Sequence, residues 1–372
     1  MDIKLASDNK CTGCATCANV CPKEAIEMIE NVQGFVQPII NENKCIKCGV
    51  CLKACPVINR YVSQNKKRPT VYGARCKDKK IRFKSTSGGI FATIAKAILN
   101  NNGIVVGAIY ETPYYVKHSV SYSMSQLEPL LQSKYVQSNI EYIYKEISEN
   151  LKKGKKVLFC GTPCQVTGLY SFFNGKPENL LTCDFICYGV NSPKAYREWL
   201  NEIKKNYGEI ERVWFKYKEN GWYNSPMCTR IDFCDKSELI LNKDNNYYMA
   251  GYIYDALYIR PSCGQCDFKG LPRNSDITLG DFWGIDDKLD DDKGTSVIIL
   301  NNEKAEKLFE NIKQDLVLWK TDLDNVIKGN HMINECVNIN DKSLEFLYNL
   351  DKFPFSTLYK KYSTKNKDNI KW

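Results

Sequence analysis

The stretch "CTGCATCANVCP" at residues 11–22 organises the N-terminal part of the chain. Its first three cysteines are separated by two residues each, and the fourth follows after three more, directly before a proline. The stretch "CIKCGVCLKACP" at residues 45–56 repeats this spacing. In such a pair, the first three thiolates of each run hold one 4Fe–4S cluster, and the fourth binds the other cluster. The two runs therefore predict a small module with two clusters.

This exchange of the fourth cysteine assigns the ligands of both clusters. The first set is Cys11, Cys14, Cys17 and Cys55, and the second set is Cys45, Cys48, Cys51 and Cys21. Between the runs, "AIEMIENVQGFVQPII" predicts a hairpin with its turn near Asn31 to Gly34. We expect residues 1–60 to form a bacterial-type ferredoxin domain, followed by a polar and basic linker at 61–69. Zinc is the alternative metal, but two matching runs favour clusters.

Length and composition limit the classes of protein that need to be considered. A chain of 372 residues, 43% hydrophobic and 26% charged, is typical of a folded protein with more than one domain. It has no apolar run of membrane-spanning length and no signal peptide, so we expect a cytoplasmic protein without a membrane span. In a reducing compartment, eighteen cysteines indicate metal binding or redox chemistry and not a disulfide framework.

Charge and histidine content narrow the chemistry further. The net charge is +9, and the basic stretches belong to no recognisable nucleic-acid motif. We therefore expect no nucleic-acid partner, and a basic face suits the docking of a small acidic redox protein. With only two histidines, His118 and His331, chemistry based on a histidine network is not expected.

From residue 70 the pattern changes to strands that alternate with helices, which predicts a mixed α/β or α+β domain over 70–301. A helix is expected to begin after Ser87, Gly88 and Gly89. Free amides and the helix dipole at this position suit a phosphate group, although such a turn is also an ordinary helix cap. The remaining residues, 302–372, are expected to form a mostly helical extension.

Four cysteines of this domain stand at special positions. Cys164 and Cys187 are expected where strands end, and "SCGQC" at residues 262–266 adds Cys263 and Cys266. Four such thiolates suffice for a third 4Fe–4S cluster, with zinc or free thiols as the alternatives. The other cysteines are expected to be packing residues, namely Cys76, Cys160, Cys183, Cys228, Cys234 and Cys336.

Six segments then occur in a specific order: "STSGGIFATIA", "SKYVQSNI", "GTPCQVTGL", "CDFICYGVNSPK", "SCGQCDFKGLPRNSDITLGDFWGI" and "GTSVIILN". Together they resemble the coenzyme F420 hydrogenase/dehydrogenase β-subunit family of iron–sulfur flavoproteins, over about 71–301. The resemblance implies a core domain with one FAD beside one 4Fe–4S cluster. Cys164, Cys187, Cys263 and Cys266 match the family's cluster-ligand positions.

The resemblance also implies a flavin site. It comprises Ser87, Gly88, Gly89, Ser133, Lys134, Tyr135, Val136, Gln137, Ser138, Asp281, Phe282, Trp283, Gly294, Thr295 and Ser296. Glycines and hydroxyls accommodate a pyrophosphate, Lys134 can offset its charge, and Tyr135 or Trp283 can lie against a ring. We expect Asp281 to be a catalytic hydrogen-bond partner or proton relay. The alternatives are a turn-capping aspartate and, for "DFWGI", an aromatic core plug.

These features predict an FAD- and iron–sulfur-dependent oxidoreductase. Electrons from ferredoxin or a similar carrier would pass through three 4Fe–4S clusters to FAD, which would reduce a small organic substrate or a deazaflavin-type coenzyme. One alternative is a non-catalytic electron-wiring subunit of a hydrogenase- or formate-dehydrogenase-like complex. Another is a ferredoxin fused to a zinc-binding sensor domain. A homo-oligomer is compatible with each.

Overall fold

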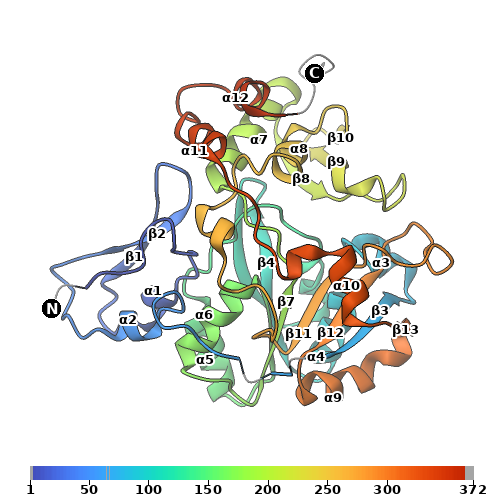
Figure 1. Ribbon diagram of the computed structural model, residues 1–372, viewed down its shortest axis with the longest axis horizontal. Coiled ribbons are helices and arrows are strands. Elements are labelled where there is room, and N and C mark those ends of the chain that lie inside the picture. The colour runs from blue at the N-terminus through green and yellow to red at the C-terminus, as the bar shows by residue number, and fades with distance from the viewer. Residues whose placement is uncertain (1–2, 64, 67, 365–372) are drawn as a thin grey trace.

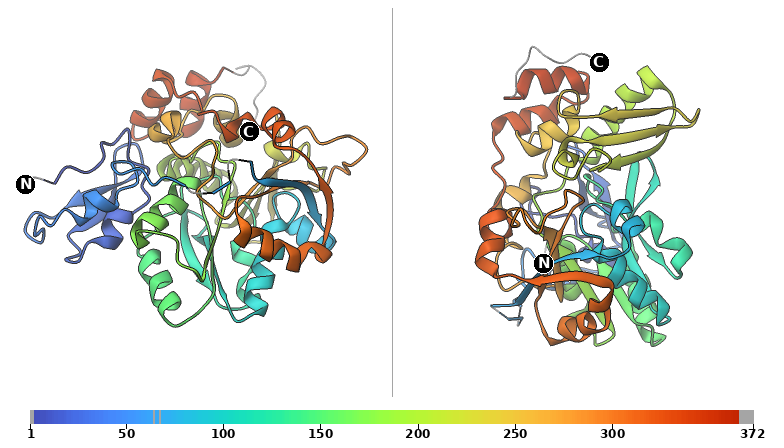
Figure 2. Two further views of the ribbon diagram at one scale, coloured as in Figure 1. Left: turned by 60° about the horizontal axis from the view of Figure 1, so that its bottom comes forward. Right: turned by 90° about the vertical axis from the view of Figure 1, so that its right-hand side faces the viewer.

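The computed structural model describes residues 3–63, 65–66 and 68–364 (Figure 1). The N-terminal module lies at one side of a large central sheet, and the last helices lie at one end of the molecule (Figures 1 and 2). The expected class, a ferredoxin-like module followed by a mixed α/β domain, agrees with this architecture.

The N-terminal module is built around the predicted hairpin. β1 (Ile26–Glu30) pairs with β2 (Val36–Ile40) in antiparallel register, from Ile26 opposite Ile40 to Glu30 opposite Val36. Two one-turn helices, α1 (Thr16–Val20) and α2 (Val50–Ala54), lie inside the cysteine runs and end directly before the fourth cysteine of each.

The central sheet has eight strands in the order β13-β3-β12-β11-β7-β6-β4-β5. Neighbours are parallel from β4 through β6 and β7 to β11, and antiparallel elsewhere. The carboxyl ends of the parallel strands therefore meet at one edge, where ligands of such sheets bind. The strands are β3 (Thr70–Cys76), β4 (Ile104–Thr112), β5 (Tyr115–Ser121), β6 (Val157–Cys160), β7 (Leu180–Phe185), β11 (Ile277–Asp281), β12 (Ser296–Leu300) and β13 (Leu316–Lys320).

Helices cover both faces of this sheet, because successive residues of its strands point to opposite sides. In β6, Val157 and Phe159 pack with α5 (Ile143–Lys152) and α6 (Pro163–Phe173). Leu158 packs on the opposite side of the sheet, in a core that includes residues of α4 (Ile90–Asn100) and α9 (Glu303–Ile312).

A second layer stands beyond the carboxyl edge of the sheet. It contains a three-stranded sheet and an aromatic core, in which Trp199 stacks on Tyr248 at 4.6 Å. Its elements are α7 (Pro193–Tyr207), β8 (Ile210–Phe215), β9 (Thr229–Phe233), β10 (Glu238–Leu241), α8 (Tyr247–Ile253), α11 (Asp341–Tyr348) and α12 (Phe355–Tyr362). Among the described residues, the other helices are α3 (Lys79–Lys84), α10 (Leu323–Gly329) and six short 3-10 turns, of which η4 (Pro261–Gln265) and η6 (His331–Ile333) concern the site.

The structure differs from two expectations about boundaries. β7 ends at Phe185, so Cys187 follows in the loop and is not the last strand residue. The extension that begins at residue 302 is mostly helical, but its strand β13 pairs with β3, so the central sheet continues past the expected boundary. Of the linker, positions 64 and 67 lie outside the described residues. Asn65 donates to three backbone carbonyls, of Arg273, Asn274 and Ser275, which ties the linker to the core.

Candidate functional site

The cysteines of the first N-terminal set lie together in a buried place. Burial raises the pKa of the Cys17 thiol, and the nearby thiols of the other three members raise it further. In the second set, burial raises the pKa of Cys51, which lies near Cys21 and Cys48, and Cys48 is exposed. Buried, crowded thiols become stable thiolates only when bound positive charge offsets them, so this donor chemistry fits iron–sulfur clusters.

The four cysteines predicted for the core domain also lie together. The Cys164 thiol interacts electrostatically with the other three, Cys187, Cys263 and Cys266. Burial, with the nearby Cys263 thiol, raises the pKa of Cys187 to about 12. We call this set the core cysteine group. Its donors fit a 4Fe–4S cluster, and cluster binding by this group stays a prediction.

A mononuclear metal site has a different geometry. Within residues 3–63, 65–66 and 68–364, no three His, Cys, Asp or Glu side chains converge closely enough to hold a single metal ion. A zinc site would need its sulfurs about 2.3 Å from one point.

The first N-terminal set adjoins the core cysteine group. Thr16 Oγ1 donates to the carbonyl oxygen of Gly168 at 2.9 Å, which joins α1 to α6. A Cβ atom on Gly168 would lie 3.1 Å from Cys14 Sγ. Gly168 stands four residues after Cys164 on α6, so both occupy the same helix face. The Tyr144 hydroxyl interacts electrostatically with Cys14 and Cys164, in agreement with this proximity.

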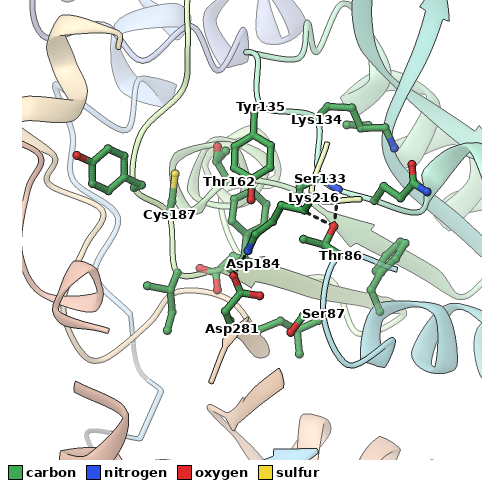
Figure 3. Close-up of a pocket in the computed structure, with 18 of the residues that line it drawn as sticks. Thr86, Ser87, Ser133, Lys134, Tyr135, Thr162, Asp184, Cys187, Lys216 and Asp281 are labelled. Atoms are coloured by element: carbon green, nitrogen blue, oxygen red, sulfur yellow. Dashed lines mark hydrogen bonds and ion pairs between the residues drawn. The ribbon is translucent and has the colours of Figure 1, made fainter. Parts of the chain in front are cut away.

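A cavity of about 610 Å³ opens at the carboxyl ends of the parallel strands (Figure 3). Its size lies within the range of cofactor sites, about 300–1,000 Å³. Cys187 of the core cysteine group lines its wall, and so does the first turn of α4. Thr86 Oγ1 accepts from the backbone N–H of Ser133 at 2.7 Å, which joins two of the loops predicted to bind the flavin.

Ten of the residues predicted for the flavin line this cavity. They are Ser87, Gly89, Ser133, Lys134, Tyr135, Val136, Ser138, Asp281, Trp283 and Ser296. Together they supply hydroxyl groups, a helix N-terminus and aromatic walls, which fit a dinucleotide cofactor. Its binding stays a prediction.

Five predicted residues do not line the cavity and have other roles. Gly88 donates its N–H to Ser296 Oγ, and a Cβ atom there would lie 2.5 Å from the carbonyl oxygen of Ala74. The carbonyl oxygens of Gly294 and Thr295 accept hydrogen bonds from the side chains of Arg82 and Ser87 respectively. The remaining two, Phe282 and Gln137, point away from the cavity.

Phe282 is buried against Trp319 in the core, as the aromatic-plug alternative described. Its neighbour Trp283 instead lines the cavity, and the ring centres of Trp283 and Trp222 are 4.4 Å apart. Gln137 donates to the Thr12 carbonyl oxygen of the N-terminal module and accepts from Arg260.

The cation that faces the centre of the cavity is Lys216, which sequence reasoning missed. Its Nζ lies 2.5 Å from Asp281 Oδ2 (Figure 3). The same Nζ is 5.5 Å from the ring centre of Trp283. Burial lowers the pKa of Lys216, but Asp281 and Tyr135 outweigh burial, and the pKa is raised overall. The only available signal was two lysines in the aromatic stretch "WFKYK", where strand β8 ends.

Lys134 has a different environment from the one expected. Its Nζ donates to the carbonyl oxygens of Pro129 and Leu131 at 2.8 and 2.7 Å and points away from Asp281 (Figure 3). Burial lowers its pKa to about 7. The nearby His118 is also buried, and burial lowers its pKa to about 4.

A buried ion pair lies between the core cysteine group and the cavity. Arg273 Nη2 is 2.9 Å from Asp184 Oδ2, and each side chain is 1% exposed. Asp184 lines the cavity. On the other side of the pair, burial raises the pKa of Cys187 and of Cys266, and the charge of Arg273 partly offsets this rise.

The C-terminal extension also contributes to the site, which no motif had indicated. Residues 329–332 line the cavity. Farther along, Cys336 Sγ accepts from the backbone N–H of Cys266 at 3.2 Å, and the Ile333 carbonyl oxygen accepts from Gly270 N–H at 2.7 Å. Cys336, expected to be a packing residue, therefore supports the loop that carries two members of the core cysteine group.

Comparison with known proteins agrees with the cysteine pattern. Residues 10–59 match the 4Fe-4S dicluster domain, and residues 154–326 match the family defined by the C terminus of the coenzyme F420 hydrogenase/dehydrogenase beta subunit. The chain is thus an iron–sulfur protein of the electron-transfer class. The predicted resemblance to the coenzyme F420 hydrogenase/dehydrogenase beta-subunit family is confirmed by this match over residues 154–326.

No curated protein sequence matches the chain. Among solved structures, it is similar to a chain of the xenon-derivatised F420-reducing [NiFe] hydrogenase complex from Methanosarcina barkeri. The two share 18% sequence identity with a TM-score of 0.49, over 73% of this chain and 92% of the other. Within the described residues, no helix combines the length and apolar character that crossing a membrane requires.

Proposed function

We propose that the chain is an iron–sulfur flavoprotein oxidoreductase. It would take electrons from ferredoxin or a similar carrier and use them to reduce a small organic substrate or a deazaflavin-type coenzyme. When bound, three 4Fe–4S clusters would supply single-electron steps, and FAD would supply two-electron chemistry. The observation that carries the proposal is the contact of the core cysteine group with both neighbours: the N-terminal module, through Gly168, and the cavity, through Cys187.

The cysteine groups provide a path from the surface to the cavity. Cys48 is exposed, whereas Cys11 and Cys14 are buried beside α6. An external carrier would therefore dock near the second set, and the first set would connect it to the core cysteine group. Tyr144 and the Arg273–Asp184 pair are buried in this region.

The cavity residues would bind and orient the flavin and its substrate. The α4 N-terminus, with the hydroxyls of Thr86 and Ser133, suits the anionic part of the cofactor. Lys216 keeps a positive charge at the cavity wall, because Asp281 fixes its ammonium group and raises its pKa against the effect of burial. This ammonium can stabilise developing negative charge or donate a proton. The lysine would then regain a proton from solvent, and the adjacent Asp281 carboxylate favours that charged form.

The alternative is a non-catalytic wiring subunit of a hydrogenase- or formate-dehydrogenase-like complex. The match to a family named for a beta subunit supports it. The two functions differ in what the isolated chain does. A self-sufficient reductase would oxidise reduced ferredoxin when its substrate is present, whereas a wiring subunit would need its partner.

The first experiment is a count of iron, acid-labile sulfide and flavin in protein purified without oxygen. About twelve irons and one FAD per chain are expected from three four-iron clusters and one flavin site. Cys187→Ser should lower the count to about eight, whereas Cys228→Ser, a buried cysteine outside the three groups, should leave it unchanged. Eight irons in the unmodified chain would remove the core cysteine group from cluster binding, and absence of flavin would refute the reductase.

A further inference from the structure

Arg260 occupies an unusual position between two cysteine groups. It is 1% exposed and directly precedes η4, whose loop carries two members of the core cysteine group. Its backbone carbonyl oxygen accepts from the N–H of Cys263 at 2.9 Å, and its own N–H donates to Val190 at 2.9 Å. The main chain at Arg260 is thus part of the core cysteine loop.

The side chain of Arg260 reaches in the opposite direction, into the N-terminal module. Nε donates to the carbonyl oxygen of Cys11 at 2.8 Å, and Nη2 donates to that of Val36 at 3.0 Å. Nη1 donates to Gln137 Oε1 at 2.8 Å, and the guanidinium lies 5.2 Å from the ring centre of Phe35. A single residue therefore connects the first N-terminal set with the core cysteine group.

The guanidinium has hydrogen-bond acceptors but no carboxylate. All three acceptors are neutral oxygens, and none of the ion pairs found within the described residues includes Arg260. The other fully buried arginine, Arg273, is paired with Asp184. Because a buried charge without a counter-charge is strongly unfavourable, Arg260 needs negative charge from another source.

The adjacent thiols can supply this charge. Arg260 lies beside both cysteine groups: a Cβ atom on Gly13, between Cys11 and Cys14, would lie 2.8 Å from its Nη1, and its own backbone carbonyl oxygen accepts from the N–H of Cys263. Each four-iron cluster with four thiolates is itself an anion, and adding an electron makes it more negative. A buried cation beside two such centres stabilises their reduced states.

We propose that Arg260 is a positioning residue that serves as the shared counter-charge of the first N-terminal cluster and the core cluster. It raises the reduction potential of both and fixes the module against the core. The proposal rests on the proposed function, because it requires clusters in both groups. The second N-terminal cluster, whose set includes the exposed Cys48, lies outside the influence of Arg260.

The test compares Arg260→Gln with Arg260→Lys in the complete, cluster-loaded chain. Both variants lose the three-way fork of hydrogen bonds, but only glutamine loses the charge. The potentials are measured by redox titration followed by electron paramagnetic resonance. Relative to the lysine variant, the glutamine variant should shift the equilibrium of the two buried clusters at least about tenfold toward oxidation, or about 59 mV for a one-electron centre.

Two controls separate charge from packing. The second N-terminal cluster should keep its potential in both variants. Arg60→Gln is the matched control, since Arg60 Nη2 also joins the N-terminal region to the core loop, at the Asp267 carbonyl oxygen, but is exposed. It should shift none of the clusters, because water screens its charge.

The outcomes are distinguishable from a failure of the proposed function. If iron and sulfide counts show no core cluster in the unmodified chain, the proposed function fails first. If the clusters are present and the two Arg260 variants have equal potentials, the counter-charge inference is wrong. Loss of the buried clusters in the glutamine variant alone would support the inference, and equal loss in both variants would overturn it.

Discussion

Removing either partner of the Lys216–Asp281 ion pair should lower the free energy of unfolding strongly. Removing both partners should lower it by less than the sum of the two single losses. The Nζ and Oδ2 atoms are 2.5 Å apart, and the side chains are 4% and 19% exposed. At this burial, little water can replace a lost partner. Leaving one member of a buried pair alone costs about 3–5 kcal/mol, whereas replacing both members removes the charges together.

The perturbation is a double-mutant cycle of Asp281→Asn, Lys216→Met and the double variant. Asparagine keeps the size of the carboxylate, and methionine keeps the unbranched apolar stem. Each single variant should lose about 3 kcal/mol, and the double variant should lose clearly less than the sum, by more than about 1 kcal/mol. Denaturant unfolding followed by tryptophan fluorescence measures these changes, with equal cofactor content in all proteins.

The exposed pair Lys236–Glu211 provides the control cycle. Its side chains are 78% and 50% exposed at an N–O distance of 2.9 Å, so its coupling should be below about 1 kcal/mol. If the losses at Lys216 and Asp281 were additive, the two groups would not act as a pair. The role of Asp281 in holding the ammonium at the cavity wall would then be refuted.

Three further changes probe other parts of the structure. Gly168→Ala should lower the melting temperature, because its Cβ would lie 2.6 Å from Thr16 Oγ1. The cost of overpacking, about 1–3 kcal/mol, outweighs the gain of about 1 kcal/mol that alanine gives in a helix. A higher melting temperature would contradict this contact. Burial lowers the pKa of Lys134 to about 7. The unfavourable contribution of Lys134 to folding stability therefore grows as the pH falls from the ordinary pKa of lysine toward 7, and it is constant at lower pH. Lys134→Met should therefore stabilise the protein more at pH 6 than at pH 10 in denaturant unfolding, and a pH-independent difference would exclude a titrating Lys134. Cys336→Ala should speed the loss of iron to a chelator. Cys336→Ser still provides an acceptor for the Cys266 N–H, so it should lose iron at the rate of the unmodified chain. Equal rates for all three proteins would show that this contact is unimportant.

The local parts of the fold were predictable because short-range rules determine them. The hairpin 26–40 and helix α7 follow from turn and cap residues a few positions apart, and Ser192 accepts from Ala195 N–H as an N-cap should. The N-terminal cysteine sets are likewise fixed by spacing. The strand end was predicted at Cys187, two residues later than the observed end at Phe185, since strand ends carry no comparable signal.

The details of the cavity depend on direction and on contacts far apart in the sequence. Neighbouring residues of an extended segment point to opposite sides, so Asp281 and Trp283 line the cavity while Phe282 enters the core. Gln137 points away from the cavity for the same reason, between Val136 and Ser138. Lys216 could not be foreseen, because it reaches Asp281 only when the second layer packs on the sheet.

The cysteine groups differ in how much of the chain must exist before each can form. The N-terminal sets draw on residues 11–55, whereas the core cysteine group joins residues 164, 187 and 263–266, and residue 336 supports its loop. Contacts between residues so far apart in the sequence form late, after the strands of the sheet have paired. During synthesis on the ribosome, we therefore expect maturation in two stages, with iron entering the N-terminal module first. Iron uptake by both regions at the same chain length would show that this order of assembly is wrong.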